Sequence, residues 1–253
     1  MWPQGFEIVR IDENEYLGVL TNDGVYFVCF TENEFGLVEH LKLDFELLLR
    51  ECKMLWQNKK IKAYKGLRCY GLVQDKKDQS LYFIETHLRT IVRFSDLHDS
   101  SSFKIYHIRN KLPSSFKAPN LKDLKLYEDI FYLPDHFIPR AEILGNDCIH
   151  LFRKNSKLDR FEYIKSIKNV RTPYCIQFID EKLVVCEREP KGALKVYVKD
   201  SDGNFEYDDT INLRCDHPYF FTKVDNQTLV TRASGNQFTY NGSPSIFSYD
   251  INF

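Results

Sequence analysis

The sequence has no long uncharged apolar run, and it has little tryptophan or methionine. Each of these two residue types occurs only twice among 253 residues, and the apolar stretches are a few residues long. A membrane-spanning helix needs about 20 consecutive apolar residues, so no membrane segment is expected. Residues 1–7 lack the basic start and apolar stretch of a secretory signal peptide. These absences predict an intracellular protein, either cytoplasmic or nuclear.

An excess of charge of one sign is also missing. The 35 basic residues nearly balance the 36 acidic ones, which leaves a formal net charge of -1. Proteins that bind nucleic acid neutralise phosphates with clustered lysine and arginine, so a nucleic-acid partner is not expected. One local basic cluster exists, and we interpret it as a solvated face; it comprises Lys59, Lys60, Lys62, Lys65 and Arg68.

Closely spaced cysteine pairs are absent. The seven cysteines are odd in number and widely spaced, and no C-x-x-C motif occurs. This pattern predicts free, buried thiols in a reducing compartment rather than a disulfide framework. Cys148 with His150, and Cys215 with His217, are zinc-compatible residue types whose i, i+2 spacing places them on one face of a strand. Two ligands do not make a closed site, so no metal or other cofactor is predicted.

Familiar catalytic motifs are missing as well. The sequence contains no G-x-S-x-G, no phosphate-binding loop, no G-x-G-x-x-G and no H-E-x-x-H. Asp208 and Asp209 are adjacent, and adjacent strand residues point to opposite faces, so they do not form a carboxylate pair. No catalytic residue is therefore predicted from a motif.

What the sequence does contain is aromatic residues and a repeat. Its 20 phenylalanines and 15 tyrosines suit pleated, half-buried strands. An alternating apolar strand, a short turn of Asp, Asn, Glu or Gly and a second apolar strand recur in four segments, at 5–17, 138–149, 172–185 and 217–230. Pro139, Pro173 and Pro218 begin three of them and lie 34 and 45 residues apart. Such a period indicates a repeat architecture.

Further strands follow each copy, which gives four strands in about forty residues, as in a propeller blade. The units resemble degenerate WD40-type blades. Residues 194–200 and 246–250 resemble the third strand of such a blade, and Tyr249-Asp250 occupies the place of its Trp-Asp ending. The resemblance implies a single all-β domain over residues 1–253, a small β-propeller of roughly five to six irregular four-stranded blades.

Two segments interrupt the β pattern with short helical insertions. In residues 44–58 the apolar side chains have helical spacing, with Asp44 as the expected cap and Asn58 as the end. The irregular segment 99–135 has a second helical spacing at Leu121, Leu124 and Tyr127. Between the insertions, strands are expected near residues 67–73, 81–86 and 90–94.

The architecture and the missing motifs favour a non-enzymatic interaction module or a subunit of a larger complex, with an unidentified protein partner. The candidate partner-binding residues form the apolar face of the first helix, namely Phe45, Leu48, Leu49, Cys52, Leu55 and Trp56. The same face could instead pack on a neighbouring blade.

The alternative function is a propeller enzyme of the hydrolase type, with its site in the central channel. Such a site needs polar side chains that converge from the inner strands of different blades. Glu7, Glu142 and Gln177 are the candidates, because they lie near the starts of three aligned units.

Overall fold

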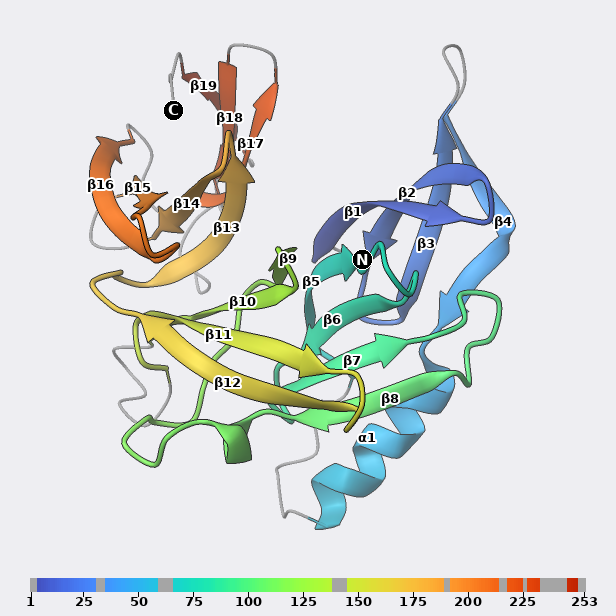
Figure 1. The fold of residues 1–253 in the computed structure, drawn as a ribbon. Coiled ribbons are helices and arrows are strands. Elements are labelled where there is room, and N and C mark those ends of the chain that lie inside the picture. Colours follow the sequence, from blue (N-terminus) through green and yellow to red (C-terminus); the bar gives the residue numbers. More distant parts are fainter. Residues whose placement is uncertain are drawn as a thin grey trace.

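Five antiparallel β-sheets follow one another around a common centre in the computed structural model of the chain (Figure 1). The structure describes residues 4–30, 35–58, 66–137, 145–188, 192–213, 218–224, 227–232 and 245–249. Four of the sheets have four strands, and the last has three. In each sheet the strands pair in chain order, which is the arrangement of a propeller blade. The predicted propeller architecture is confirmed, with four complete blades and a three-stranded sheet in the described residues.

The first two sheets contain strands β1 to β8. The strands of the first are β1 (Gly5–Ile11), β2 (Asn14–Leu20), β3 (Gly24–Phe30) and β4 (Phe35–Asp44). Those of the second are β5 (Cys69–Gln74), β6 (Leu81–Glu85), β7 (Thr90–Phe94) and β8 (Phe103–His107). The three strands expected between residues 67 and 94 are confirmed as β5, β6 and β7.

The last three sheets contain strands β9 to β19. The third sheet has β9 (Lys125–Tyr127), β10 (Ile130–Asp135), β11 (Cys148–Asn155) and β12 (Arg160–Ile167). The fourth has β13 (Pro173–Ile179), β14 (Lys182–Glu187), β15 (Ala193–Lys199) and β16 (Phe205–Asn212). The fifth has β17 (Pro218–Val224), β18 (Gln227–Arg232) and β19 (Ser245–Tyr249). As the WD40-like resemblance implies, β15 and β19 are third strands.

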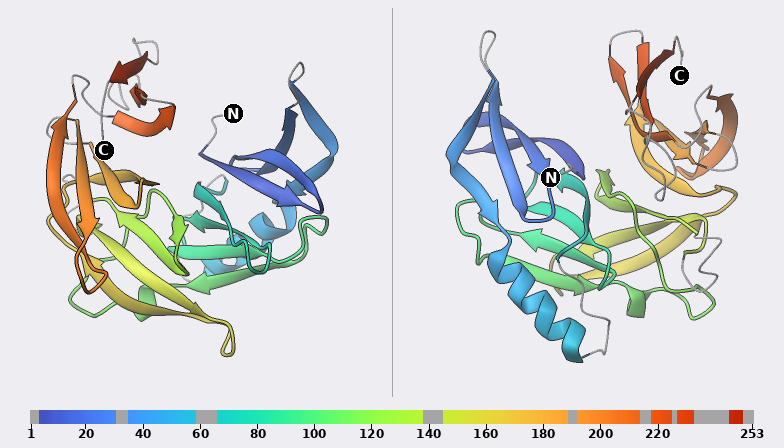
Figure 2. Two further views of the ribbon diagram at one scale, coloured as in Figure 1. Left: turned by 45° about the horizontal axis from the view of Figure 1, so that its top comes forward. Right: turned by 180° about the vertical axis from the view of Figure 1, so that it is seen from behind.

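The first strand of every sheet lies toward the centre. Neighbouring inner strands pack side by side from β1 to β5, then to β9, β13 and β17. Within the described residues, β17 and β1 do not pack together in this way, and the five sheets form an open arc (Figure 2).

Tight turns join the inner strands to their neighbours. Asp180 and Glu181 connect β13 to β14 with φ of 48° and 64°. Glu128 and Asp129 connect β9 to β10 with φ of 49° and 64°. Positive φ at both central residues is the type I′ geometry whose twist matches that of a hairpin. The turn at Asp180 and Glu181 was predicted, whereas that at Glu128 and Asp129 lies in the segment that was expected to be irregular; both hold the register of the inner strands.

Apolar side chains fill the space between each pair of neighbouring sheets. One cluster lies between the first and second sheets and a second between the second and third. Two more lie between the third and fourth and between the fourth and fifth. The middle sheets are therefore buried on both faces, and this explains why β6 is apolar at four successive positions, Leu81 to Ile84, and buried throughout.

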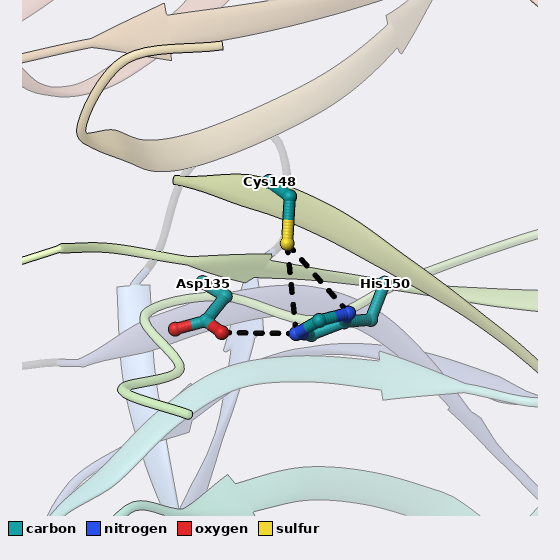
Figure 3. Close-up of side chains that lie close together, drawn as sticks. All are labelled: Asp135, Cys148 and His150. Atoms are coloured by element: carbon teal, nitrogen blue, oxygen red, sulfur yellow. Dashed lines mark hydrogen bonds and ion pairs between the residues drawn. The ribbon is translucent and has the colours of Figure 1, made fainter. Parts of the chain in front are cut away.

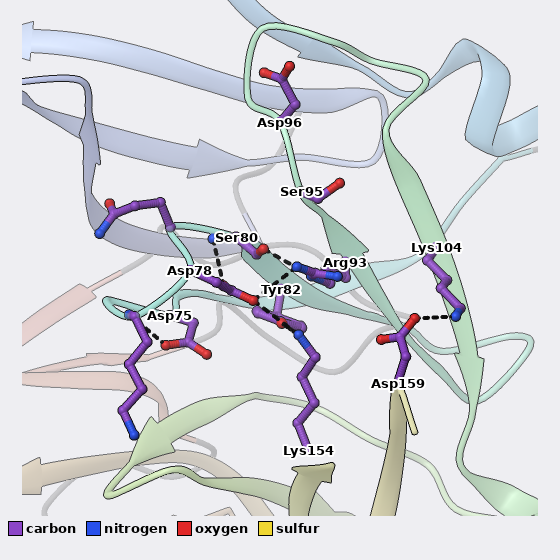
Figure 4. Close-up of polar contacts among 12 residues, drawn as sticks. Asp75, Asp78, Ser80, Tyr82, Arg93, Ser95, Asp96, Lys104, Lys154 and Asp159 are labelled. Atoms are coloured by element: carbon purple, nitrogen blue, oxygen red, sulfur yellow. Dashed lines mark hydrogen bonds and ion pairs between the residues drawn. The ribbon is translucent and has the colours of Figure 1, made fainter. Parts of the chain in front are cut away.

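Polar contacts also join the second sheet to the third (Figure 4). Asp78 accepts hydrogen bonds from Arg93 at 2.9 Å and from Lys154 of β11 at 3.0 Å. Lys154 also donates to the Tyr82 hydroxyl at 2.8 Å. Because Arg93 and Tyr82 belong to the second sheet, this network fixes the two blades relative to each other.

Helix α1 (Glu46–Asn58) is the first predicted insertion, and it is confirmed with the expected cap and end. The Asp44 carboxylate accepts a hydrogen bond from the Glu46 backbone N–H at 2.7 Å. With 13 residues, α1 is too short to cross a membrane, and no helix in the described ranges is both long and apolar enough to do so.

The second predicted helix is wrong. Residues 125–127 form strand β9, and Leu121 makes an isolated bridge with Asp135. Leu121 and Leu124 are both fully buried in this extended segment. The helical spacing arose because a crossing segment between two blades is buried on more than one side.

Gly71 allows the second and third inner strands to approach each other. Its φ is +60°, and a Cβ atom there would lie 2.3 Å from the Leu124 backbone nitrogen and 2.8 Å from an Asp123 carboxylate oxygen. We expect Gly71→Ala to lower the free energy of unfolding by about 2–4 kcal/mol, from left-handed backbone strain and overpacking. Urea unfolding measures this, with Gly66→Ala as the control because Gly66 has open space around it. A loss no larger than that of the control would contradict the expectation.

Candidate functional site

A pocket of about 750 Å³ lies where the inner strands converge. Residues from β1, β5, β9, β13 and β17 line it, so every described sheet contributes. Its charged side chains are Glu7, Asp123 and Lys125, and Gln177 adds an amide. Two of the three channel residues expected for an enzyme, Glu7 and Gln177, therefore line one pocket. The third, Glu142, lies outside the described residues.

Glu7 is a half-buried carboxyl group on β1. Burial raises its pKa above the usual value for glutamate, although Lys125 and a hydrogen bond from the Ile8 backbone act in the opposite direction. The nearby Asp123 carboxyl also raises the pKa of Glu7. A carboxyl group whose pKa lies closer to neutrality is a better acceptor of a proton from water.

Asp123 is fixed between two blades. Its carboxylate accepts hydrogen bonds from the backbone N–H of Leu124 at 2.8 Å and of Ile176 in β13 at 3.1 Å. It is only 3% exposed, and burial raises its pKa. Because each of its oxygens is held by a backbone N–H, Asp123 fixes the backbone before β9 against that of β13.

Lys125 begins β9 and is half-buried. Burial alone would lower the pKa of its ammonium group. Asp123, Cys175 and Glu7 together raise the pKa by more than burial lowers it, so the pKa lies above the usual value for lysine. The ammonium therefore stays charged at neutral pH. A fixed cation in a pocket with apolar walls can stabilise negative charge that develops on a substrate.

Cys175 and Gln177 come from β13. Burial raises the pKa of the Cys175 thiol well above its usual value, and a neutral thiol is a poor nucleophile. Gln177 donates from Nε2 to the Phe221 carbonyl of β17 at 3.0 Å. This bond ties the fourth sheet to the fifth, which makes Gln177 a positioning residue in the described structure.

Aromatic rings from four of the five inner strands line the pocket. Tyr127 stacks on Phe178 with ring centroids 4.1 Å apart and an angle of 8° between the rings. Phe6, Phe220 and Phe221 also line the pocket. The site thus combines a titratable carboxyl group and a fixed cation with a largely apolar surround.

A second polar cluster lies within the third blade (Figure 3). Asp135, Cys148 and His150 are all buried, and their potential ligand atoms lie within 4.8 Å of one another. The i, i+2 pair Cys148 and His150 does share one face of β11, as the sequence indicated. The Cys148 sulfur lies 3.7 Å from both ring nitrogens of His150.

Hydrogen bonds account for this cluster without a metal. One His150 nitrogen is 2.9 Å from an Asp135 oxygen, and the other is 2.8 Å from the Ser166 hydroxyl. Ser166 lies directly opposite His150 in β12. A metal ion on His150 would have to replace one of these bonds. We therefore interpret the two hydrogen bonds that link Asp135, His150 and Ser166 as a structural connection across β10, β11 and β12, which we call the strut. The second cysteine–histidine pair, Cys215 and His217, lies outside the described residues.

The predicted partner-binding face of α1 packs inside the chain. Phe45, Leu48, Cys52 and Trp56 are buried in the cluster between the first two sheets, and Leu49 and Leu55 are partly buried against it. Phe45 stacks on Phe83, with ring centroids 4.9 Å apart. The apolar face of α1 therefore packs on neighbouring blades, which was the alternative to partner binding. None of its six residues lines the central pocket. Partner binding at α1 stays a prediction.

Sequence reasoning missed Asp123 and Lys125 because it placed both in a short helix. The available signal was their i, i+2 spacing, which continues to Tyr127 and puts three pocket residues along one extended segment. The alignment of the repeat copy at residues 138–149 was also displaced by one strand. Cys148 and Ile149, aligned with a second strand, belong to the third strand β11.

The fold is that of a β-propeller, and solved structures of this class resemble it. One is a Bacteroides uniformis protein provisionally named a 6-phosphogluconolactonase, with a TM-score of 0.56, 10% identity, and 99% of this chain and 86% of that chain covered. Another is the periplasmic gluconolactonase of Pseudomonas aeruginosa, with a TM-score of 0.52, 10% identity, and 98% and 70% covered.

A third similar structure is a protein from Lactobacillus plantarum, with a TM-score of 0.54 and 12% identity. The match covers 82% of this chain but spans only 54% of that protein. At the level of sequence, no protein-family model matches the chain, and a search of curated proteins gives no match.

These matches contradict the leading functional prediction. A non-enzymatic interaction module gains no support from them, and that prediction is wrong, because the neighbours whose names state a function are named as enzymes, among them the two lactonases above and a luciferin-regenerating enzyme. They favour the alternative, a propeller enzyme with a site in its central channel. At 10–12% identity the likeness establishes the fold, and the reaction has to be argued from the pocket.

Proposed function

We propose that the chain is a hydrolase that opens a small cyclic ester, a lactone, in its central pocket. The observation that carries this proposal is the convergence of Glu7 and Lys125 from two inner strands on one pocket. The names of the similar propellers support the choice of substrate class.

In the proposed reaction, Glu7 acts as the general base. Its carboxylate accepts a proton from a water molecule, and the resulting hydroxide attacks the carbonyl carbon of the lactone. The pKa of Glu7, raised by burial, makes this transfer easier than it is for an exposed glutamate. Asp123 shapes the same region by fixing the backbone of Leu124, which precedes Lys125.

Lys125 stabilises the negative charge that forms on the carbonyl oxygen during the attack. When the tetrahedral intermediate collapses, the bond between the carbonyl carbon and the ring oxygen breaks. Protonated Glu7 then returns its proton to the departing ring oxygen. The product is one hydroxy acid for each lactone and water consumed, so atoms and charge balance.

A panel assay tests the proposal. The purified chain is incubated with five- and six-membered lactones of polyhydroxy acids, with γ-butyrolactone and with an acyclic ester, and acid release is followed with a pH indicator. We expect at least one lactone to be opened faster than its spontaneous hydrolysis. No acceleration for any compound in the panel would refute the proposal.

The Lys125→Met variant tests in this assay whether the ammonium group of Lys125 contributes to the rate. Removing one group that stabilises an oxyanion costs about 10²- to 10³-fold in kcat, and this loss is expected here. Lys157→Met is the matched control, because Lys157 lies exposed in the turn between β11 and β12. Lys125→Arg keeps the charge and should retain more activity than Lys125→Met. Thermal melts confirm that each variant is folded.

A further inference from the structure

Basic side chains gather at the end of the channel where the inner strands begin. Arg68 precedes β5, Lys122 lies just before β9, and Arg188 follows β14. The pairing of Cys69 with Glu85, of Leu121 with Asp135 and of Pro173 with Glu187 brings these positions to the same edge of three neighbouring sheets. Arg68 is exposed and Arg188 is half-buried, so the cluster of Arg68, Lys122 and Arg188 is open to solvent at its rim.

Lys122 is the least exposed residue of this cluster. The residue is only 8% exposed, and its ammonium group lies 5.0 Å from the centre of the Tyr70 ring. Among the described residues, no carboxylate or carbonyl group forms an ion pair or a hydrogen bond with Nζ of Lys122. The ammonium group of a lysine that is so little exposed normally has such a partner, because burial without one carries a large desolvation cost.

The neighbouring acidic group does not supply that partner. Asp135 is the acidic side chain that acts on Lys122, but its oxygens already accept bonds from the Asn120 backbone, from the Asn146 amide and from His150. Arg68 and Arg188 act on Lys122 more strongly and in the opposite direction. Burial, Arg68 and Arg188 together lower the pKa of Lys122 to about 7.

A histidine adds a second unpaired atom. His136 follows β10 and is 6% exposed, and its buried Nδ1 has no hydrogen-bond partner in the part of the chain that the structure describes. Its ring lies 5.9 Å from that of Tyr174. Burial and the positive charge of Lys122 lower the pKa of His136 to about 4, so the ring is neutral at pH 7 and adds no positive charge beside Lys122.

We propose that the cluster of Arg68, Lys122 and Arg188 is a binding site for the carboxylate or phosphate group of a small molecule, with Lys122 as its anchor. An oxyanion placed there supplies the acceptor that Nζ of Lys122 lacks, and it offsets the repulsion among three cations. The site is argued from its own residues and does not depend on the hydrolase proposal.

Isothermal titration calorimetry with inorganic phosphate and with gluconate tests the site, with sorbitol as the uncharged control at matched ionic strength. We expect wild type to bind at least one of the two anions and not sorbitol, and the stronger ligand identifies the preferred oxyanion. In Lys122→Met the affinity should fall by about 10- to 100-fold, the size of a lost charge-assisted hydrogen bond. Lys157→Met should bind as wild type does.

Proton uptake gives a second, independent readout. An anion stabilises the charged ammonium, so binding near pH 7.5 should take up a proton at Lys122, which calorimetry in buffers of different ionisation enthalpy detects. Lys122→Arg should still bind the anion but take up fewer protons than wild type, because arginine does not titrate in this range, whereas any titration of phosphate itself contributes to both proteins. Failure of wild type to bind either anion, or unchanged affinity in a folded Lys122→Met, overturns the proposal, and neither result bears on lactone hydrolysis.

Discussion

Replacing Glu7 with glutamine is expected to slow lactone hydrolysis by about 10²- to 10⁴-fold, the contribution of a general base. The substitution keeps the shape of the side chain and removes its ability to accept a proton. Because Glu7 is half-buried and accepts a hydrogen bond from the adjacent Ile8 backbone, the amide can keep that bond through its oxygen. The loss should therefore appear in kcat, with little change in KM.

The pH dependence of kcat/KM identifies Glu7 as the group responsible. Glu7 works as a base only when it is deprotonated, so the rate should fall as the pH drops through its pKa. Burial raises that pKa, and the acid limb should lie above the usual range for glutamate. In Glu7→Gln this limb should disappear from the residual activity.

Glu13→Gln is the matched control, because Glu13 lies exposed in the turn between β1 and β2. It should keep the rate and the pH profile of wild type. A folded Glu7→Gln protein with at least half the wild-type kcat would show that another group activates the water. The pocket would then have to be reassigned, while the lactone panel would still report whether the chain is a hydrolase.

Among the variants proposed for this protein, the loss of the strut in the third blade should lower the free energy of unfolding most. His150 is fully buried between Asp135 and Ser166, and it joins three strands through two hydrogen bonds. Removing one partner of a buried pair costs about 3–5 kcal/mol, and we expect His150→Ala to lower the free energy of unfolding by this amount. Urea unfolding at neutral pH measures the change.

Two further variants test the reason for that loss. His98→Ala removes an exposed histidine that lies 3.7 Å from Asp12, and it should change stability by less than about 0.5 kcal/mol. His150→Gln can present a donor to Asp135 and should recover part of the loss. If His150→Ala cost no more than His98→Ala, the buried bonds would not be the source of the stability of this blade.

Local patterns predicted the elements that have a single buried face. Helix α1 was predictable because Leu48, Cys52 and Trp56 repeat on one side and the Asp44 cap precedes them. The hairpins were predictable because acidic and amide residues favour the positive φ that Asp180 and Glu181 adopt. In each case the signal lies within a few residues of the element.

The site was harder to predict because it depends on how separate blades meet. Glu7 and Gln177 were found because the repeat placed both near the start of an aligned unit, and the first strand of each unit lies toward the centre. Asp123 and Lys125 were missed because β9 has only three residues, too few for an alternating pattern to stand out from the crossing segment before it. The ammonium group of Lys122, which has no acceptor among the described residues, has no signature in the sequence, because its surroundings come from three separate sheets.

The open arc described above also determines how the molecule loses its structure. Within the described residues each sheet packs on its chain neighbours, so the first and fifth sheets have one such neighbour and the other three have two. Stability in such an array is approximately a sum of nearest-neighbour interfaces, and disruption starts at the ends. Backbone amides in β17 and β18 should therefore exchange with solvent sooner than those in β10 and β11. Local unfolding would start at the fifth sheet before it reaches the middle of the arc.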